Sequence, residues 1–133
     1  MYLLPTQNST VTKEQLETEI EWELFHMGFH PDLKGFCYIR DAVIMLIDDS
    51  AMIYGITKTL YPEVAKKSNT KTTVVERAIR LSIEIAWEKS GEHSLHNYFS
   101  HYPDKPTNRT VLAFLYMYIN AELNPNRRLF ITH

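Results

Sequence analysis

Side chains that can recognise DNA are concentrated between residues 57 and 89. A short helix is expected from an N-cap at Thr57 to about Lys67, and a long helix over about 72–89. The turn Ser68-Asn69-Thr70 separates them. A helix-turn-helix reads DNA by placing the start of its second helix in the major groove, while the first helix braces against the backbone. The pattern predicts such a motif, although any two packed helices joined by a short turn can imitate it.

The start of the long helix carries residue types that read base edges. Arginine can bind O6 and N7 of guanine with two hydrogen bonds, and glutamate can accept one from the amino group of cytosine. We predict that four side chains face the bases: Lys71, Thr73, Glu76 and Arg77. A second group of cations is predicted to contact phosphates: Lys58, Lys66, Lys67 and Arg80.

Two purely structural interpretations compete with this one. Thr73 and Glu76 have the spacing of a capping box, in which Glu76 would bond to the first turn of its own helix. Arg80 and Glu84 have the spacing of an ordinary solvated ion pair on a helix. The sequence leaves both alternatives open.

Charge is distributed unevenly along a chain whose formal net charge is −2. Residues 12–26 carry one lysine and five glutamates, whereas residues 57–91 carry seven cations and four glutamates. Salt screens charges beyond about 8–10 Å, so the local surplus decides what a surface attracts. The basic middle of the chain is therefore compatible with binding a polyanion through one face.

The 133 residues suit a single domain, and their patterning favours helices. Only 4 Gly and 6 Pro, with few alternating apolar and polar runs, argue against an all-β fold. We predict an all-α bundle of about six helices over residues 12–123, a flexible N-terminal arm over 1–11 and a C-terminal tail over 124–133. The helices are expected at about 12–27, 33–48, 57–67, 72–89 and 108–122, with a single helical turn at 94–100.

Three local details refine these expectations. Thr12 and Gln15 should form a capping box at the start of the first helix. Pro62 lies too deep for a helix that begins at Lys58, so a bend or a late start is expected. The last helix is apolar nearly all round, which suits either the buried centre of the bundle or a helix that meets a partner.

Other chemistry finds little support in the sequence. The single cysteine, Cys37, excludes an internal disulfide and is interpreted as a small core residue in a cytoplasmic protein. His93, His96 and His101 have loose metal-ligand spacing, but no residues complete a ligand shell. No phosphate-binding loop, nucleophile motif or membrane-spanning stretch is present, so we expect no enzyme, no cofactor, no metal and no membrane association.

Three motifs occur in a fixed order along the chain. They are Lys34-Gly35-Phe36 with Tyr38, Arg40 and Ala42; Leu60-Tyr61-Pro62 through Ala65-Lys66-Lys67, Asn69-Thr70 and Val75-Glu76-Arg77-Ala78-Ile79-Arg80; and Lys105-Pro106-Thr107-Asn108. With them, residues 14–120 or so resemble the effector domain of the stage-zero sporulation protein A family. The resemblance implies a six-helix DNA-binding domain that recognises a short promoter box and contacts RNA polymerase.

The sequence departs from that family at defined positions. The family reads bases through an Arg-x-Glu-Arg set, of which Glu76 and Arg77 match the last two members and Val74 replaces the first. Leu81 stands where the family usually has histidine. Valine has no donor for guanine, but it could contact a thymine methyl group. Family members also carry a receiver domain before this one, and we expect the chain to lack it because only about a dozen residues precede its first helix.

The sequence therefore predicts a cytoplasmic, sequence-specific transcription regulator that binds double-stranded DNA. The resemblance adds the sigma factor of RNA polymerase as a candidate partner, and a second copy of the chain bound through the last helix as another. The alternative is a relative that acts by protein–protein contact, titrating a full-length regulator or RNA polymerase, with Val74 and Leu81 as apolar contacts.

Overall fold

The computed structural model describes residues 2–3 and 10–123. Its regular secondary structure is helical apart from one pairing of two-residue strands. Five α-helices follow one another: α1 (Lys13–His26), α2 (Lys34–Asp48), α3 (Tyr61–Lys67), α4 (Thr72–Glu88) and α5 (Asn108–Leu123). Three short helical segments accompany them: the 3-10 turns η1 (Ser50–Gly55) and η3 (Leu95–Asn97), and the π turn η2 (Ile56–Leu60). β1 (Tyr2–Leu3) pairs antiparallel with β2 (Thr10–Val11).

The all-α prediction is confirmed, whereas the count of about six helices is not. The single helical turn expected at 94–100 is the three-residue 3-10 turn η3, so the described residues contain five α-helices. Residues 1 and 4–9 of the expected arm lie outside the described residues, as does the whole expected tail, 124–133.

Local signals explain where the first helix begins and ends. The Thr12 hydroxyl accepts a hydrogen bond from the Gln15 amide (3.1 Å), and the Gln15 side chain accepts one from the Thr12 amide (2.8 Å). The predicted capping box is thus confirmed. Gly28 follows the helix with a φ of +92°, a left-handed conformation that glycine adopts without a steric penalty.

Pro62 sets the late start of the third helix. The chain turns through η2, and α3 then begins at Tyr61 with Pro62 in its first turn. Proline has no amide hydrogen to donate, so the first turn, where such hydrogens lack helical partners anyway, tolerates it. The expected late start is confirmed, and Thr57 lies within η2 and is not a helix cap.

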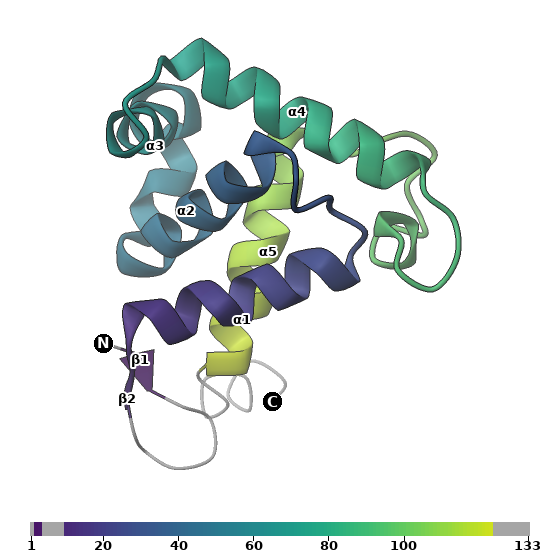
Figure 1. Ribbon diagram of the computed structural model, residues 1–133, viewed down its shortest axis with the longest axis horizontal. Coiled ribbons are helices and arrows are strands. Elements are labelled where there is room, and N and C mark those ends of the chain that lie inside the picture. Colours follow the sequence, from purple (N-terminus) through teal and green to yellow (C-terminus); the bar gives the residue numbers. More distant parts are fainter. Residues whose placement is uncertain (1, 4–9, 124–133) are drawn as a thin grey trace.

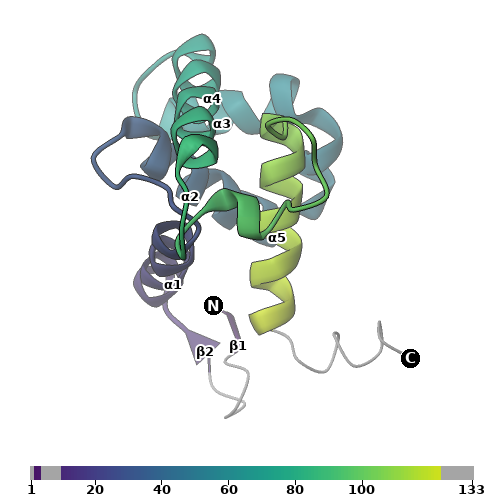
Figure 2. The same ribbon diagram turned by 90° about the vertical axis from the view of Figure 1, so that its right-hand side faces the viewer.

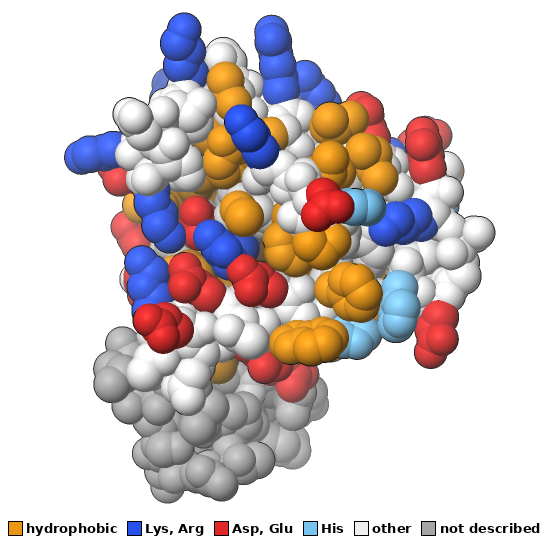
Figure 3. All heavy atoms as spheres, viewed as in Figure 1, with side chains coloured by type: hydrophobic (Ala, Val, Ile, Leu, Met, Phe, Trp, Pro, Cys, Tyr) orange, Lys and Arg blue, Asp and Glu red, His pale blue; other side chains and the backbone are white. Residues whose placement is uncertain are grey.

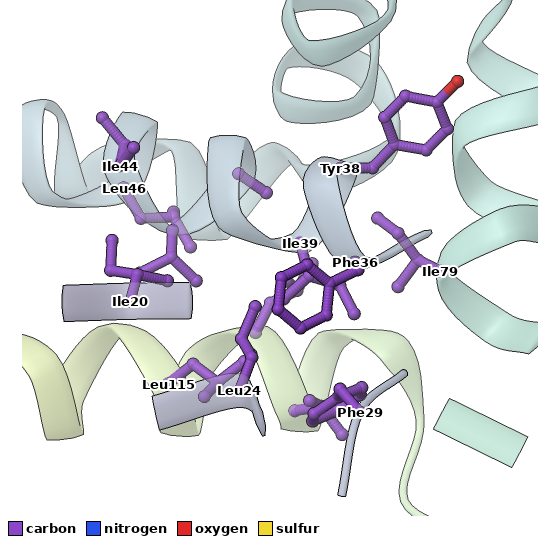
Figure 4. Packing of buried hydrophobic residues seen from close by; sticks show 14 of the residues in the cluster. Ile20, Leu24, Phe29, Phe36, Tyr38, Ile39, Ile44, Leu46, Ile79 and Leu115 are labelled. Carbon is purple, nitrogen blue, oxygen red and sulfur yellow. The ribbon is translucent and has the colours of Figure 1, made fainter. Parts of the chain in front are cut away.

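Helix α2 lies at the centre of the domain. It packs against α1, α3, α4 and α5, with α4 and α1 on opposite sides of it (Figures 1 and 2). Ile39 of α2 is fully buried together with Leu24 of α1, Ile79 of α4 and Leu115 of α5 (Figure 4). One core therefore fixes all of the long helices relative to α2.

The last helix packs mainly into this core. Val111, Leu112, Leu115, Ile119 and Leu123 are buried, while Met117 on another side is 66% exposed. Of the two interpretations of its apolar sequence, burial accounts for most of it.

Cys37 is exposed, so the prediction that it is a core residue was wrong. Its neighbours Phe36, Tyr38 and Ile39 occupy the buried positions of α2, and Cys37 falls on the solvent side of the same turn. Apolar character at adjacent positions did not reveal which residue faced outward.

The crossing of α2 over α4 is unusually close at Gly35. A Cβ atom at this position would lie 2.2 Å from the carbonyl oxygen of Ala78 and 2.1 Å from the hydroxyl of Ser82. Glycine costs a helix about 1 kcal/mol relative to alanine, so its presence inside α2 needs a reason. The close approach of the two backbones supplies that reason.

Ser82 sits beneath this crossing in an apolar setting. Its side chain is buried, and its hydroxyl has no hydrogen-bond partner among the described residues. A buried hydroxyl without a partner loses its hydration and gains nothing in return. We infer that Ser82 is tolerated for its small size and not for its polarity.

Replacing Gly35 by alanine should destabilise the domain by about 2 kcal/mol or more, because a backbone oxygen cannot move aside as a flexible side chain can. Urea unfolding measures the change. The control is Gly55→Ala, where the nearest atom is the flexible Thr59 hydroxyl at 3.1 Å, and a change within about 0.5 kcal/mol is expected. Equal effects of the two substitutions would contradict the close crossing.

Ser82→Ala should raise the free energy of unfolding, by up to about 1 kcal/mol, since it removes the unsatisfied hydroxyl and favours the helix. The matched control is Ser94→Ala. The Ser94 hydroxyl is also buried, but it donates to the Lys89 carbonyl (2.8 Å) and accepts from the His96 amide (3.2 Å). Thermal unfolding should show stabilisation at 82 and destabilisation at 94; destabilisation at both positions would show that the Ser82 hydroxyl is satisfied.

Candidate nucleic-acid interface

A tight turn joins α3 to α4. Asn69 adopts a left-handed conformation (φ +53°), the Thr70 amide donates to the Ala65 carbonyl (2.9 Å), and the Asn69 amide donates to the Lys66 carbonyl (3.2 Å). These two bonds satisfy carbonyls that the end of a helix leaves without partners, and asparagine tolerates the left-handed position better than most residues. The predicted turn at 68–70 is confirmed, and it fixes the direction in which α4 leaves α3.

Helix α4 has a buried and an exposed side. Val75, Ile79, Ser82, Ile83 and Ala86 face the core at helical spacing. Of the residues predicted to face bases, Lys71, Thr73 and Arg77 are exposed and Glu76 is partly buried. Lys and Arg side chains project from the upper edge of the molecule, over α3 and α4 (Figure 3).

Glu76 and Arg80 form an ion pair on the exposed side of α4. The alternative in which Glu76 caps the helix was wrong, because α4 begins at Thr72 and its N-cap, Lys71, makes no side-chain capping bond. The alternative pair of Arg80 with Glu84 is also not seen, since Glu84 pairs with Lys105 at 3.0 Å. Glu76 is the fifth residue of α4, which places its side chain beyond the usual reach of the first backbone amides.

Arg77 follows Glu76 in the sequence and is exposed. Among the described residues, no hydrogen bond or ion pair engages its guanidinium group. A guanidinium without an intramolecular hydrogen bond or ion pair has all of its N–H donors available for an external acceptor.

The four predicted phosphate-contacting cations differ in whether a carboxylate of the domain already pairs with them. Lys58 on η2 and Lys66 at the end of α3 are exposed, and Arg80 is bound to Glu76. The Lys67 ammonium lies 3.0 Å from Oδ1 of Asp41 and 3.9 Å from Oε2 of Glu17. Lys67 is therefore directed toward α1 and α2.

Asp41 is the centre of a charged network that the sequence analysis missed. Its carboxylate is buried and also accepts from Nε of Arg40 (3.1 Å), while another Arg40 nitrogen lies 2.6 Å from Oε2 of Glu21. Burial alone would lower the pKa of Arg40, but its bonds with Glu21 and Asp41 raise that pKa above its ordinary value. The network joins α1, α2 and α3 just before the turn into α4.

A cleft borders α4 on the side of α5. It is lined by Glu76 and Arg80 of α4, by Thr57 and Tyr61, and by residues 105–109. Among the described residues, no group of three or more histidine, cysteine, aspartate or glutamate side chains is placed to bind a metal ion. The same part of the chain contains no helix with the length and apolar character that a membrane crossing requires.

An all-helical domain that presents an exposed, cation-bearing helix after a tight turn is typical of helical DNA-binding domains. The family model described as "Sporulation initiation factor Spo0A C terminal" matches residues 20–119. The chain therefore belongs to this family, which confirms the resemblance seen in the sequence. This family is the DNA-binding effector domain of a sporulation regulator.

The network around Asp41 should contribute measurably to stability. Asp41→Asn removes the charge that Lys67 and Arg40 share, and we expect a loss of about 2 kcal/mol, below the roughly 3–5 kcal/mol of fully buried pairs because Lys67 can turn toward water. Glu84→Gln breaks the exposed pair with Lys105 and should cost less than about 1 kcal/mol. Urea unfolding of both variants tests this difference, and equal losses would show that the network contributes no more than a surface pair.

Proposed function

We propose that the chain is a sequence-specific DNA-binding transcription regulator in which α3, the turn at 68–71 and α4 act as a helix-turn-helix. The observation that carries this proposal is the exposure and lack of pairing of the Arg77 side chain among the described residues. Its guanidinium is exposed and unpartnered among the described residues, on the outward side of the helix that follows the turn. A major groove offers guanine O6 and N7 as the two acceptors that suit such a group.

Lys71, Thr73, Glu76 and Arg77 are the proposed base contacts. The ion pair with Arg80 restricts the Glu76 carboxylate to a narrow range of positions, and one of its oxygens stays available for a cytosine amino group. Arg77 is adjacent in sequence and contributes the guanine contact. Together they suit a C·G step in the recognised box.

Lys58, Lys66, Lys67 and Arg80 are the proposed phosphate contacts, which position the protein without reading sequence. Lys58 and Lys66 are exposed, so they are expected to contribute most. Lys67 would have to share its ammonium group between Asp41 and a phosphate, so its contribution should be the smallest of the four.

The distribution of charge orients the domain on a duplex. Lys and Arg side chains line the upper edge over α3 and α4, and the glutamate-rich α1 lies on the opposite side of α2, where the cations are interspersed with carboxylates (Figures 1 and 3). A polyanion is attracted to the first side and repelled by the second. Long-range attraction therefore favours the same face that the proposed base contacts occupy.

A second function is favoured by two apolar residues on the same helix. Val74 is 39% exposed and Leu81 is 49% exposed. Figure 3 shows hydrophobic side chains on the same face as the cations. In this alternative α4 contacts a protein, such as a full-length regulator or the sigma factor of RNA polymerase, and the exposed Met117 side of α5 would contact a second copy of the chain.

Arg77→Ala should weaken binding to a promoter box of the family by about 1–3 kcal/mol and leave binding to a scrambled duplex almost unchanged. Lys58→Ala is the matched control, because loss of a phosphate contact should weaken both duplexes equally and reduce the salt dependence by about one counterion. Fluorescence anisotropy over a series of salt concentrations measures both effects.

Equal binding of both duplexes by the native chain would rule out sequence-specific recognition. The alternative function would gain support if the chain failed to bind duplex DNA at low salt and bound a purified full-length regulator or sigma factor, with loss of that complex in a Val74→Asp variant.

A further inference from the structure

The side chain of Asn108 connects three helices. Asn108 is the first residue of α5, and its Nδ2 atom lies 3.1 Å from the hydroxyl oxygen of Tyr61 in α3 and 3.2 Å from the carbonyl oxygen of Glu76 in α4. A carboxamide nitrogen carries two hydrogens, and these two bonds use both of them. The amide thus holds the start of α5 to both members of the helix pair.

The residue before it leaves Asn108 free for this contact. The hydroxyl of Thr107 accepts from the Thr110 amide (3.2 Å), and the Thr107 carbonyl accepts from the Val111 amide (3.0 Å). Thr107 therefore caps the start of α5, a role that asparagine often has at other helix starts. The Asn108 side chain is available to point across the interface instead of along its own helix.

The two acceptors are well suited to hold a fixed position. Tyr61 is only 3% exposed, and burial raises the pKa of its phenol, with the Asn108 bond acting in the opposite direction. The Glu76 carbonyl belongs to the backbone of α4 at the residue that precedes Arg77. A carbonyl oxygen has two lone pairs, so it can accept from Asn108 in addition to its own helical bond.

We propose that Asn108 is a positioning residue for base recognition. It does not touch DNA, but it fixes how the first turns of α4 are rotated and placed relative to α3 and α5. Glu76 and Arg77 are positioned with these turns. This inference rests on the proposed function. Base readout depends on hydrogen bonds whose donor and acceptor must meet within a few tenths of an ångström, so small shifts of α4 weaken it. Phosphate contacts through flexible lysines tolerate such shifts.

The decisive substitution is Asn108→Asp, which keeps the shape of the side chain but replaces both donor hydrogens with a carboxylate oxygen. The carboxylate would face the Glu76 carbonyl with no hydrogen to offer. The ratio of affinities for a family promoter box and a scrambled duplex should fall about fivefold or more, as expected for partial loss of one bidentate base contact. The slope of affinity against salt should stay the same, because no phosphate contact is removed.

The chain contains a matched control in Asn97. Its Nδ2 atom also donates to two carbonyl oxygens, those of Gly91 (3.2 Å) and Glu92 (2.8 Å), but it lies in the segment after α4. Asn97→Asp likewise removes two hydrogen bonds donated by Nδ2 and adds the same charge. It should leave the ratio of affinities within about twofold of the native value, since it does not touch the helix pair.

Two further variants separate charge from positioning and guard against misfolding. Asn108→Ala removes the donors without adding charge and should lower the ratio in the same direction. Tyr61→Phe removes one of the two acceptors and should lower it less. All ratios are measured at a temperature where circular dichroism shows each variant folded, and if Asn108→Asp does not fold, Asn108→Ala and Tyr61→Phe decide.

The outcomes distinguish this inference from the proposed function. If the native chain discriminates between duplexes and Arg77→Ala lowers the discrimination, the proposed function holds. An unchanged ratio in the folded Asn108 variants, or an equal fall in Asn97→Asp, then overturns the positioning role alone. If the native chain does not discriminate, both fall together.

Discussion

The close crossing of α2 and α4 at Gly35 is the constraint on which the rest of the domain depends. With no Cβ at this position, the backbones approach until the Ala78 carbonyl and the Ser82 hydroxyl occupy the space that a methyl group would need. Because α2 also packs against α1, α3 and α5, it is the reference for every other long helix. The depth at which α4 lies on α2 therefore determines which of its residues are left outside, and Val74, Arg77 and Leu81 are among them.

Two polar connections hold the helix pair to this core in addition to the apolar packing. The network of Asp41 joins the end of α3 to α1 and α2, and the Asn108 amide joins α3 and α4 to α5. The two lie at different ends of α3, on either side of the tight turn. Hydrogen bonds have directional preferences that dispersion contacts lack, so these partly buried bonds favour one orientation of the helix pair.

Features that depend on nearby residues could be predicted from the sequence, and features that depend on distant ones could not. The capping box at Thr12, the late start imposed by Pro62 and the buried stripe of α4 all follow from spacings of a few residues. Lys67 and Asp41 are 26 residues apart in the sequence, and Asn108 and Tyr61 are 47 residues apart. No local pattern therefore predicted either contact. The burial of Cys37 and the capping alternative for Glu76 were wrong for a related reason. The sequence shows that several positions can be buried or paired, while the tertiary structure selects one. The base and phosphate contacts remain predictions.

The outer side of α4 also constrains how its two candidate functions relate. Val74, Arg77 and Leu81 follow one another at intervals of three and four residues, so they form a single row along the helix. Either a thymine methyl or an apolar patch on a protein would cover Val74, and either guanine or a carboxylate would satisfy Arg77. Both occupants need the same row, and a major groove that admits α4 leaves no room for a protein on that side. Binding of DNA and of a protein through this helix would therefore compete on one copy of the chain, and a partner that occupies α4 would act as an inhibitor of DNA binding.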